Sequence, residues 1–501
     1  MKNNILILFF LVVSGNAFCQ ITYEERLEIE LRNGYGNERI IQFDELGFIL
    51  NSKKSDLIDG QREWKFDMYD TDLKLKKSAT LLIDKKYAID EIAVIDNRLH
   101  TLYKTKKGGY VLHAIQAGTL TETKIEGELP KSTTIKDMVI MGDFAYFYAR
   151  QKKLRFLYVI NWRTGDVQKG VVDIPDYSTI SLKLIRFQVL EANNEVLLFI
   201  RASKNKKESE VYVLRYDGNG ERKGKFKLTE NVENNFSSIS ASPLGENHYV
   251  FTGTYSSKRS TLSEGLFFCE AEDDKMSYVE YYNFTDLENF LKYLPERKQE
   301  KIEKKKQRKE DAGKELKINY LIAEHPIVQL DDGYLFLGEA YYPTYRTEFY
   351  TTYVNGSPVT KTKQVFDGYQ YTHAVLAKFD KYGEMVWDEI FEMWPSYKPF
   401  RVKRFISIAD GEQDALNVVF ASRGQITSKS FDFDGNVLSD ETSEPIETSV
   451  EGDQTKRSFS NITYWYDKYF LAYGSQKIKN KEEESGKRKR KVYFVSKIKF
   501  E

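Results

Sequence analysis

The 501-residue chain has two cysteines, five histidines and ten prolines, and its 75 Lys and Arg residues balance its 75 Asp and Glu residues. If Cys19 belongs to a cleaved leader, as argued below, the mature chain retains only Cys269 and forms no intramolecular disulfide. Cys269 ends the apolar run Leu266–Cys269, which indicates a buried packing residue rather than a nucleophile. The balanced charge gives no general attraction to nucleic acid or to an anionic membrane.

Sequence motifs for catalysis are also lacking. The chain contains no nucleophile elbow, Walker loop or dinucleotide-binding loop. Asp432–Asn436 only faintly resembles a calcium loop, because the third acidic position and the distant Glu are missing. No metal, cofactor or catalytic residue is therefore predicted. The five histidines have no metal-ligand spacing: His100, His113, His248, His325 and His373.

Aromatic residues are abundant instead, with 34 Tyr and 32 Phe, and they favour strands. The segment Ala374–Phe391 has the pattern of two short strands joined by the turn Phe379–Gly383. Similar hairpins are predicted along the whole chain. They cover Ile40–Leu50, Glu63–Thr80, Ile92–Tyr103, Tyr110–Ile125, Met138–Tyr148, Phe156–Val172, Val211–Leu228, Leu266–Tyr282 and Ser430–Leu438.

The turns recur about every 45–55 residues, a spacing typical of repeat folds. About four strands per period indicate an all-β protein, a β-propeller of about seven or eight four-stranded blades, in which each blade covers its neighbours. We expect residues 20–501 to form this single domain. The last repeat ends at the strand Val492–Phe500, and the segment Tyr23–Arg32 is expected to add an outer strand that locks the ring. Two packed β-sandwiches are the competing architecture.

The N-terminus has the layout of a secretory signal peptide over residues 1–19. Lys2 precedes the apolar run Ile5–Val13, and small residues follow it up to Cys19. Cleavage after Cys19 would leave Gln20 as the first residue. A lipoprotein is the alternative, but Phe18 stands where a lipobox has a small residue. The predicted location is extracytoplasmic: periplasmic, outer-membrane-associated or secreted, with no transmembrane segment in the mature chain.

One late period is twice the usual length and contains two insertions. The first, residues 285–317, begins with the capping box Thr285–Glu288, which predicts a helix. Its apolar face would hold Leu287, Phe290, Leu291 and Leu294, and the helix is expected to bend or restart at Pro295 and to be charged beyond it. We interpret it as a helix docked on the ring by its first turns, with a solvated charged remainder; a protruding segment that binds a partner protein is the alternative. The second, residues 338–371, is rich in tyrosine and is predicted to be a long hairpin turning at Asn355-Gly356. The residues predicted to form a recognition surface are Glu339, Tyr341, Tyr342, Tyr345, Arg346 and Tyr369.

A second charged stretch, Lys477–Lys491, has acidic residues followed by basic ones. Because strands are expected on both sides of it, we interpret it as a solvated hairpin loop. A contact with anionic envelope polymers is the alternative interpretation.

The unit Phe379–Trp387, aromatic-Asp-x-x-Gly followed by a tryptophan, resembles the repeat of exported β-propeller proteins common in Bacteroidota. A blade motif does not define a function. We therefore expect a non-catalytic binding or scaffolding module for an envelope protein or a carbohydrate, with a hydrolase acting on glycans or peptides as the alternative and a purely structural ring as a third. Convergent carboxylates of raised pKa at the channel mouth would favour the enzyme, whereas exposed Tyr with Arg would favour binding.

Overall fold

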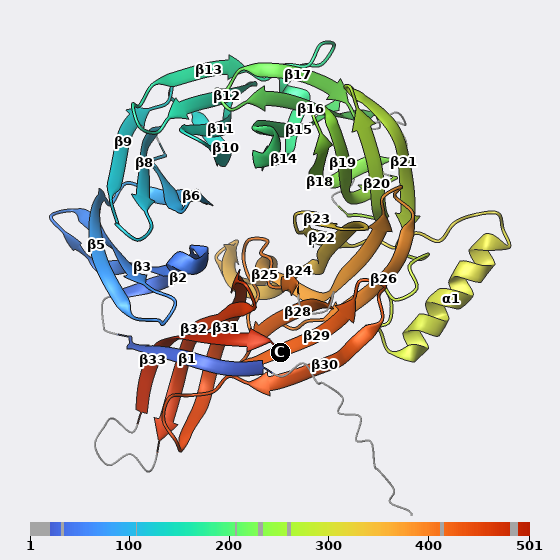
Figure 1. The fold of residues 1–501 in the computed structure, drawn as a ribbon. Helices are drawn as coiled ribbons and strands as arrows, with labels where there is room; N and C mark the ends of the chain where they lie inside the picture. The colour runs from blue at the N-terminus through green and yellow to red at the C-terminus, as the bar shows by residue number, and fades with distance from the viewer. Residues whose placement is uncertain are drawn as a thin grey trace, which may run out of the picture.

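The computed structural model describes residues 21–31, 35–106, 108–205, 208–228, 234–257, 262–410, 415–480 and 489–500. In this part of the chain, eight antiparallel sheets follow one another in sequence, seven of four strands and one of five. Figure 1 shows them arranged as the blades of a ring. The all-β propeller prediction is therefore confirmed with eight blades, and the two-sandwich alternative is wrong.

In each of the first four blades the strands run from the centre of the ring outwards. Blade 1 holds β2 (Tyr35–Gln42), β3 (Phe48–Ile58), β4 (Gln61–Tyr69) and β5 (Leu75–Asp84). Blade 2 holds β6 (Ala88–Ile95), β7 (Arg98–Lys104), β8 (Gly109–Gln116) and β9 (Glu122–Glu128). Blade 3 holds β10 (Thr133–Met141), β11 (Phe144–Gln151), β12 (Leu154–Asn161) and β13 (Val167–Val171). Blade 4 holds β14 (Leu182–Leu190), β15 (Glu195–Ser203), β16 (Ser209–Asp217) and β17 (Arg222–Lys227).

The other four blades include the five-stranded sheet, in which two short strands share the inner position. Blade 5 holds β18 (Asn235–Gly245), β19 (His248–Ser256), β20 (Gly265–Glu272) and β21 (Lys275–Asn283). Blade 6 holds β22 (Leu321–Glu324), β23 (Val328–Leu330), β24 (Gly333–Val354), β25 (Ser357–Asp380) and β26 (Met385–Glu392). Blade 7 holds β27 (Ser407–Asp410), β28 (Ala415–Ser422), β29 (Gln425–Asp432) and β30 (Val437–Pro445). Blade 8 holds β31 (Asp453–Tyr466), β32 (Tyr469–Asn480), β33 (Lys489–Phe500) and, on the outside, β1 (Ile21–Glu30).

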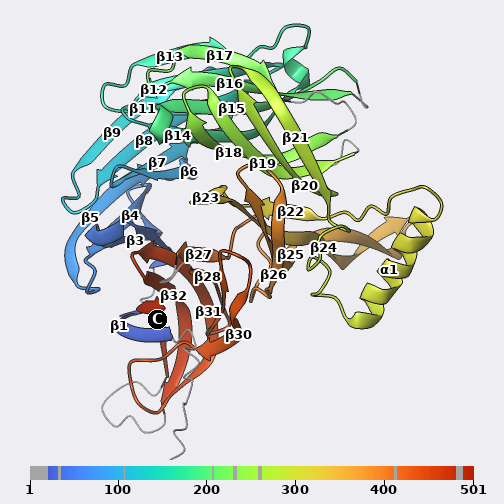
Figure 2. The same ribbon diagram turned by 45° about the vertical axis from the view of Figure 1, so that its right-hand side comes forward.

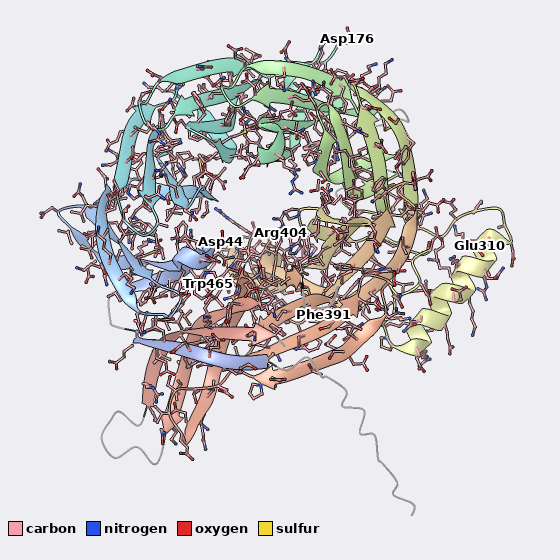
Figure 3. The ribbon with its side chains drawn as sticks, in the orientation of Figure 1. Asp44, Asp176, Glu310, Phe391, Arg404 and Trp465 are labelled. Atoms are coloured by element: carbon pink, nitrogen blue, oxygen red, sulfur yellow. The ribbon has the colours of Figure 1, made fainter. Side chains whose placement is uncertain are left out.

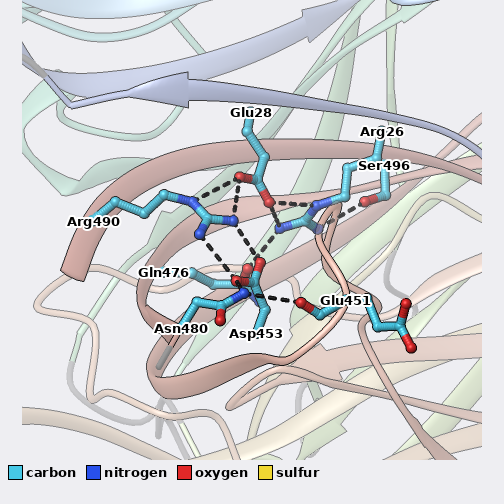
Figure 4. A network of polar contacts seen from close by, with 8 residues as sticks. All are labelled: Arg26, Glu28, Glu451, Asp453, Gln476, Asn480, Arg490 and Ser496. Atoms are coloured by element: carbon cyan, nitrogen blue, oxygen red, sulfur yellow. Dashed lines mark hydrogen bonds and ion pairs between the residues drawn. The ribbon is translucent and has the colours of Figure 1, made fainter. Parts of the chain in front are cut away.

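The N-terminal strand closes the ring, as predicted. β1 pairs with β33 in antiparallel register from Ile21 opposite Phe500 onwards. Figure 4 shows the polar network that joins them, in which Arg490 contacts Glu28 at 3.2 Å and Asp453 at 2.5 Å. Arg26 contacts Glu28 at 2.9 Å. Side chains from both ends of the chain therefore hold the last blade together.

The hydrophobic core is divided among the interfaces between blades. Each of the eight clusters of buried residues draws its side chains from two neighbouring blades. Phe199 of blade 4, for example, packs edge-on against Phe251 of blade 5 at 5.9 Å. At the closure, Trp465 of blade 8 donates its indole N–H to the Gly47 carbonyl of blade 1 at 3.2 Å, next to Asp44 (Figure 3). Every blade thus covers the apolar faces of its neighbours.

The recurrent Asp-x-x-Gly turns have a common hydrogen-bond pattern. Asp380 accepts hydrogen bonds from the backbone N–H groups of Tyr382 and Glu384, at 2.8 and 2.9 Å. The same pattern recurs at Asp217, and at Asp70, where Leu73 with positive φ stands in place of the glycine. An aspartate that caps its own turn stabilises a tight hairpin without other support. This explains why a local motif repeats between blades of otherwise different sequence.

The first insertion differs from its prediction. The capping box does not form, because Thr285 donates to the Leu316 carbonyl, and the N–H groups of Glu288 and Asn289 donate to the carboxylate of Asp388 instead. Residues 285–295 form turns, while α1 (Glu296–Glu310) begins after Pro295 and buries none of its residues. A buried carboxylate from β26 therefore outcompetes the local helix signal. The predicted apolar positions Leu287 and Phe290 are nevertheless buried, and α1 lies outside the ring in Figure 1.

Three features emerge on one face of the ring, named here the insertion face. In an antiparallel four-stranded blade, the loop between the second and third strands lies at the same end as the connection to the next blade. The β24–β25 hairpin, the insertion carrying α1 and the segment 393–406 between blades 6 and 7 therefore share this face. Figure 2 shows β24 extending beyond the ring.

Candidate functional site

The tyrosine-rich hairpin is confirmed, and its outer half extends beyond its blade. β24 and β25 stay paired to the turn at Asn355-Gly356, where both residues have positive φ. β22 pairs with β24 only as far as Tyr341, and β26 pairs with β25 only as far as His373. Residues 342–370, named here the arm, therefore form a two-stranded ribbon.

The two faces of the arm differ in chemistry. Tyr345, Phe349 and Tyr353 lie four positions apart on one face of the arm and are 60%, 73% and 74% exposed. On the other face, Glu348 lies 2.9 Å from Arg346 and 3.3 Å from Lys363. This second face also carries Tyr350, which is 45% exposed, so it combines ion pairs with one aromatic ring, whereas the first face presents three aromatic rings to solvent. Exposed aromatic surface of this kind commonly marks an interaction site.

A ladder of aromatic rings connects the base of the arm to the core between blades 6 and 7. Each ring lies 5.0–6.4 Å from the next. The segment 393–406 supports the outer part of the ladder, since Phe400 contacts Phe366 at 5.9 Å. The base of the arm is therefore fixed to the ring. From the core outwards the ladder runs Phe420, Phe405, Tyr371, Tyr341, Tyr369, Phe366 and Tyr345.

The six residues predicted to form a recognition surface lie in three environments. Tyr342 and Tyr345 are exposed, at 50% and 60%, and Arg346 lies on the charged face of the arm. Tyr341 and Tyr369 are half-buried within the ladder. The sixth residue, Glu339, is completely buried and so does not belong to any exposed surface.

Glu339 has a different place in the fold. Its Oε1 accepts hydrogen bonds from the backbone N–H groups of Phe405 and Ile406, at 2.7 and 2.9 Å. The same oxygen lies 2.7 Å from Nε2 of His325. A carboxylate of blade 6 therefore holds the connection to blade 7 at the centre of the insertion face, immediately after Arg404.

Six inner strands carry a register irregularity close to their first residue. In β14, Leu184 pairs with Ile200 and Arg186 with Phe199, which leaves Ile185 as an extra residue. Such bulges re-aim neighbouring side chains. At five of the six sites, a charged residue soon after the start of the strand was the sequence signal, and it was missed. The residues that follow the irregularities are Arg39, Glu91, Asp137, Arg186, Ser238 and Arg457.

The six residues that follow these irregularities are named here the belt. Two of them, Arg186 and Ser238, line a cavity of about 520 Å³ at the mouth of the ring, named here the mouth cavity. It lies between the inner strands of blades 4, 5 and 6 and the segment 393–406. Figure 3 shows Arg404 towards the centre of the ring. The lining divides into the polar residues Arg186, Ser238, Glu324, Lys403 and Arg404 and the apolar residues Ile185, Ile239, Ile322, Ala323 and Val402.

Glu324 organises the charges of the mouth cavity. Its Oε1 lies 3.3 Å from NH1 of Arg186, and its backbone carbonyl accepts a hydrogen bond from Nε of Arg404 at 2.6 Å. Burial raises the pKa of Glu324 to about 7, although Arg186 opposes this shift. Elsewhere in the belt, burial raises the pKa of Asp137 to about 6, and burial with the charge of Asp137 raises that of Glu91 to about 7. Carboxylates of raised pKa are therefore present on the inner strands, whereas the exposed tyrosines lie on the arm and the lining of the mouth cavity includes no tyrosine.

The histidines and Cys269 lie away from any cluster suited to a metal. Among the described residues, no group of three or more His, Cys, Asp or Glu side chains could hold an ion. His100 and His373 are buried in aromatic surroundings, and burial lowers the pKa of each to about 3. Cys269 is buried in the core, as predicted, and burial raises the pKa of its thiol. In the same described ranges, no helix is long and apolar enough to span a membrane.

Comparison with known proteins gives structural similarity only. No protein-family model and no curated protein matches the chain. A polysaccharide lyase, Uly1, is 10% identical, with a TM-score of 0.38 over 95% of this chain and 99% of that one. The WD40 domain of SCAP from fission yeast is 9% identical, with a TM-score of 0.38 over 95% and 98%. A prolyl endopeptidase is 9% identical, with a TM-score of 0.39 over 90% of this chain, which spans about half (54%) of that protein.

Proposed function

We propose that this propeller is a non-catalytic binding module that captures a partner protein of the cell envelope with the aromatic face of its arm. The observation that carries the proposal is the exposure of Tyr345, Phe349 and Tyr353 on one side of a two-stranded ribbon. An isolated two-stranded hairpin is at best marginally stable in water, so a ribbon with an uncovered aromatic face gains stability when another surface covers it.

The shape of the arm favours a protein over a carbohydrate as the partner. The three rings recur at every fourth position of an extended strand, from Tyr345 to Tyr353, so all three point to the same side of the paired ribbon. Tyrosine and other aromatic side chains dominate the energetics of protein interfaces because they bury a large area at small entropic cost. The charged opposite face, around Glu348, stays solvated when the aromatic face is occupied.

Photo-crosslinking in the native host tests this proposal. A photoreactive amino acid at Phe349 should crosslink one predominant protein, whereas the same group at Glu348, on the opposite face, should not. The partner identified in this way is then purified, and the triple variant Tyr345→Ser, Phe349→Ser, Tyr353→Ser should weaken its binding at least a hundredfold. Equal crosslinking from both faces, or unchanged affinity of the triple variant, would contradict the proposal. Retention on envelope glycans that the triple variant loses would point to carbohydrate instead.

A hydrolase is the second candidate, favoured by the raised pKa values of Glu91, Asp137 and Glu324. A glycosidase needs two carboxylates facing each other across a substrate cleft. Of these three residues, only Glu324 lines the mouth cavity, and its carboxylate forms an ion pair with Arg186. Binding is therefore the better-supported function. Release of reducing ends or peptide fragments that Glu91→Gln and Asp137→Asn abolish would establish the enzyme.

We propose an extracytoplasmic location, and residues 1–20 lie outside the described residues. The support is the order of Lys2, the apolar run Ile5–Val13 and the small residues before Cys19. N-terminal sequencing of the protein from the native host should give Gln20 as the first residue. Detection of the intact N-terminus, or of a lipid on Cys19, would contradict simple export.

A further inference from the structure

We infer that the mouth cavity binds the free C-terminal carboxylate of a peptide chain that ends in an aliphatic residue. The inference does not depend on the arm, because the arm lines no part of this cavity. It rests on the charges, the walls and the backbone edges of the cavity.

The charges favour an anion. Three cationic side chains, Arg186, Lys403 and Arg404, line the cavity against the single carboxylate of Glu324. Arg186 divides its hydrogen bonds between Glu324 and the Ile239 carbonyl. Arg404 donates a hydrogen bond only from Nε, to the Glu324 carbonyl. Within the described chain, its terminal nitrogens make no hydrogen bond or ion pair. An exposed guanidinium of this kind binds a carboxylate through two parallel hydrogen bonds.

Arg404 is held in place before any ligand arrives. The buried Oε1 of Glu339 accepts the N–H groups of the two residues that follow Arg404, and Nε of Arg404 itself is fixed at 2.6 Å from the Glu324 carbonyl. A donor that is already oriented loses little entropy when it binds, which increases affinity.

The walls favour an aliphatic group beside the anion. Ile185, Ile239, Ile322 and Val402 line the cavity, and no aromatic ring does so. Sugar-binding sites usually offer aromatic platforms, whereas branched aliphatic walls fit an aliphatic side chain. The volume of about 520 Å³ falls within the range of small-ligand sites and accommodates the last two or three residues of a peptide.

Backbone groups supply the third argument. β14, β18 and β22 are inner strands, each paired with a neighbouring strand on one side only. Their other edges face the centre of the ring. Side chains already occupy the carbonyls of Ile239 and Glu324 and both backbone groups of Ala241, and the other N–H and C=O groups of these edges can pair with an extended chain. A free carboxylate, an aliphatic side chain and an extended backbone occur together at a peptide C-terminus.

A randomised peptide pool tests the inference with the full-length protein. Octapeptides with free carboxylates are passed over the immobilised protein, and the same pool with amidated C-termini is the matched ligand control. The free pool should be retained at least tenfold better, with enrichment of Leu, Ile or Val at the last position. Equal retention of the amidated pool, or no retention of either pool, would overturn the inference. Retention of uronate oligosaccharides in place of peptides would show that the carboxylate comes from a sugar and would overturn it as well.

Protein variants provide the second arm of the test. Arg404→Ala should lower retention of the free pool about tenfold or more, and Arg404→Lys should restore it only partly, because an ammonium lacks the planar fork. Arg163→Ala is the matched control, because Arg163 is an exposed, ion-paired arginine in a turn on the opposite face of the ring. The triple arm variant should retain peptides normally, which separates failure of this inference from failure of the proposed function. Unchanged retention by Arg404→Ala would overturn it.

Discussion

The buried carboxylate of Glu339 lies 2.7 Å from the backbone nitrogen of Phe405, 66 residues further along the chain. Both residues are almost inaccessible to solvent. This hydrogen bond, with its neighbour from Ile406, joins the second strand of blade 6 to the connection that enters blade 7. It also fixes the position of Arg404 in the mouth cavity. The contact therefore links the packing of two blades to the geometry of a candidate binding site.

We expect Glu339→Gln to destabilise the protein by about 1–3 kcal/mol, because the charge of the acceptor is lost in a site that water cannot reach. The free energy of unfolding in urea measures the effect. Glu348→Gln is the matched control, since Glu348 lies on the same strand but is partly exposed, at 36% for its side chain, and the change should affect stability little. Equal changes in the free energy of unfolding for the two variants would show that the hydrogen bonds of Glu339 with Phe405 and Ile406 add no stability. Glu339→Gln should also weaken retention of the free peptide pool.

The repeat architecture was predictable because its signals are local. An aspartate that accepts hydrogen bonds from the second and fourth following residues, as Asp380 does, defines a hairpin turn within a few positions. The spacing of such turns was sufficient to predict the propeller, and the final strand Val492–Phe500 pointed to its closure by the N-terminal segment Tyr23–Arg32, of which Arg32 lies outside the described residues. The long hairpin was predictable in the same way, from Asn355-Gly356 and the alternating rings around it.

The mouth cavity was not predictable, because its residues meet only in the folded ring. Arg186 and Glu324 are 138 positions apart, and nothing near either residue identifies the other. The incorrect capping box has the same origin, since Asp388 lies 100 positions from Glu288. In both the mouth cavity and the failed capping box, hydrogen bonds between residues far apart in the sequence determine the local structure. Glu339 lies close in sequence to the exposed tyrosines, but it is buried and holds the connection between blades 6 and 7 instead of belonging to a recognition surface.

Glu324 should make stability fall as pH rises. Its pKa is about 7 in the folded protein and about 4.3 in the unfolded chain, so between these values the folded state binds more protons than the unfolded state. Stability is therefore lost across this window and stays low above it. Glu324→Gln removes the effect, so its stability relative to the wild type should rise by roughly 2–3 kcal/mol from pH 5 to pH 8. Arg186, Arg404 and Lys403 line the same cavity as this carboxylate.

Urea unfolding at several pH values between 5 and 8 measures this difference. A difference that does not change with pH would mean that Glu324 titrates normally. Asp137 and Glu91 also titrate in this window, but they are present in both proteins, so their contributions cancel in the comparison unless they couple to Glu324.

Glu28 at the ring closure should show the opposite pH dependence. Burial alone would raise its pKa, but Arg26 and then Arg490 outweigh burial and lower it. A lowered pKa contributes stability that is present above the unfolded value of about 4.3 and is lost as pH falls through the folded value. Glu28→Gln should cost about 1–2 kcal/mol at pH 7 and progressively less below pH 4. Thermal unfolding from pH 3 to pH 7 tests this, and a constant cost would argue against an ionic role.

Gly383 should tolerate no side chain, because a turn of blade 6 contacts blade 5 there. The residue has φ +85°, and a Cβ at this position would lie 2.3 Å from Cδ1 of Phe268, which is buried in the core. Gly383→Ala combines backbone strain with overpacking and should destabilise by about 2–4 kcal/mol. Gly118→Ala is the matched control, since Gly118 has φ +77° but no atom within 4 Å of the added carbon. It should cost only about 1 kcal/mol. Equal costs in urea unfolding would show that strain alone, and not contact between blades, requires glycine in the repeat.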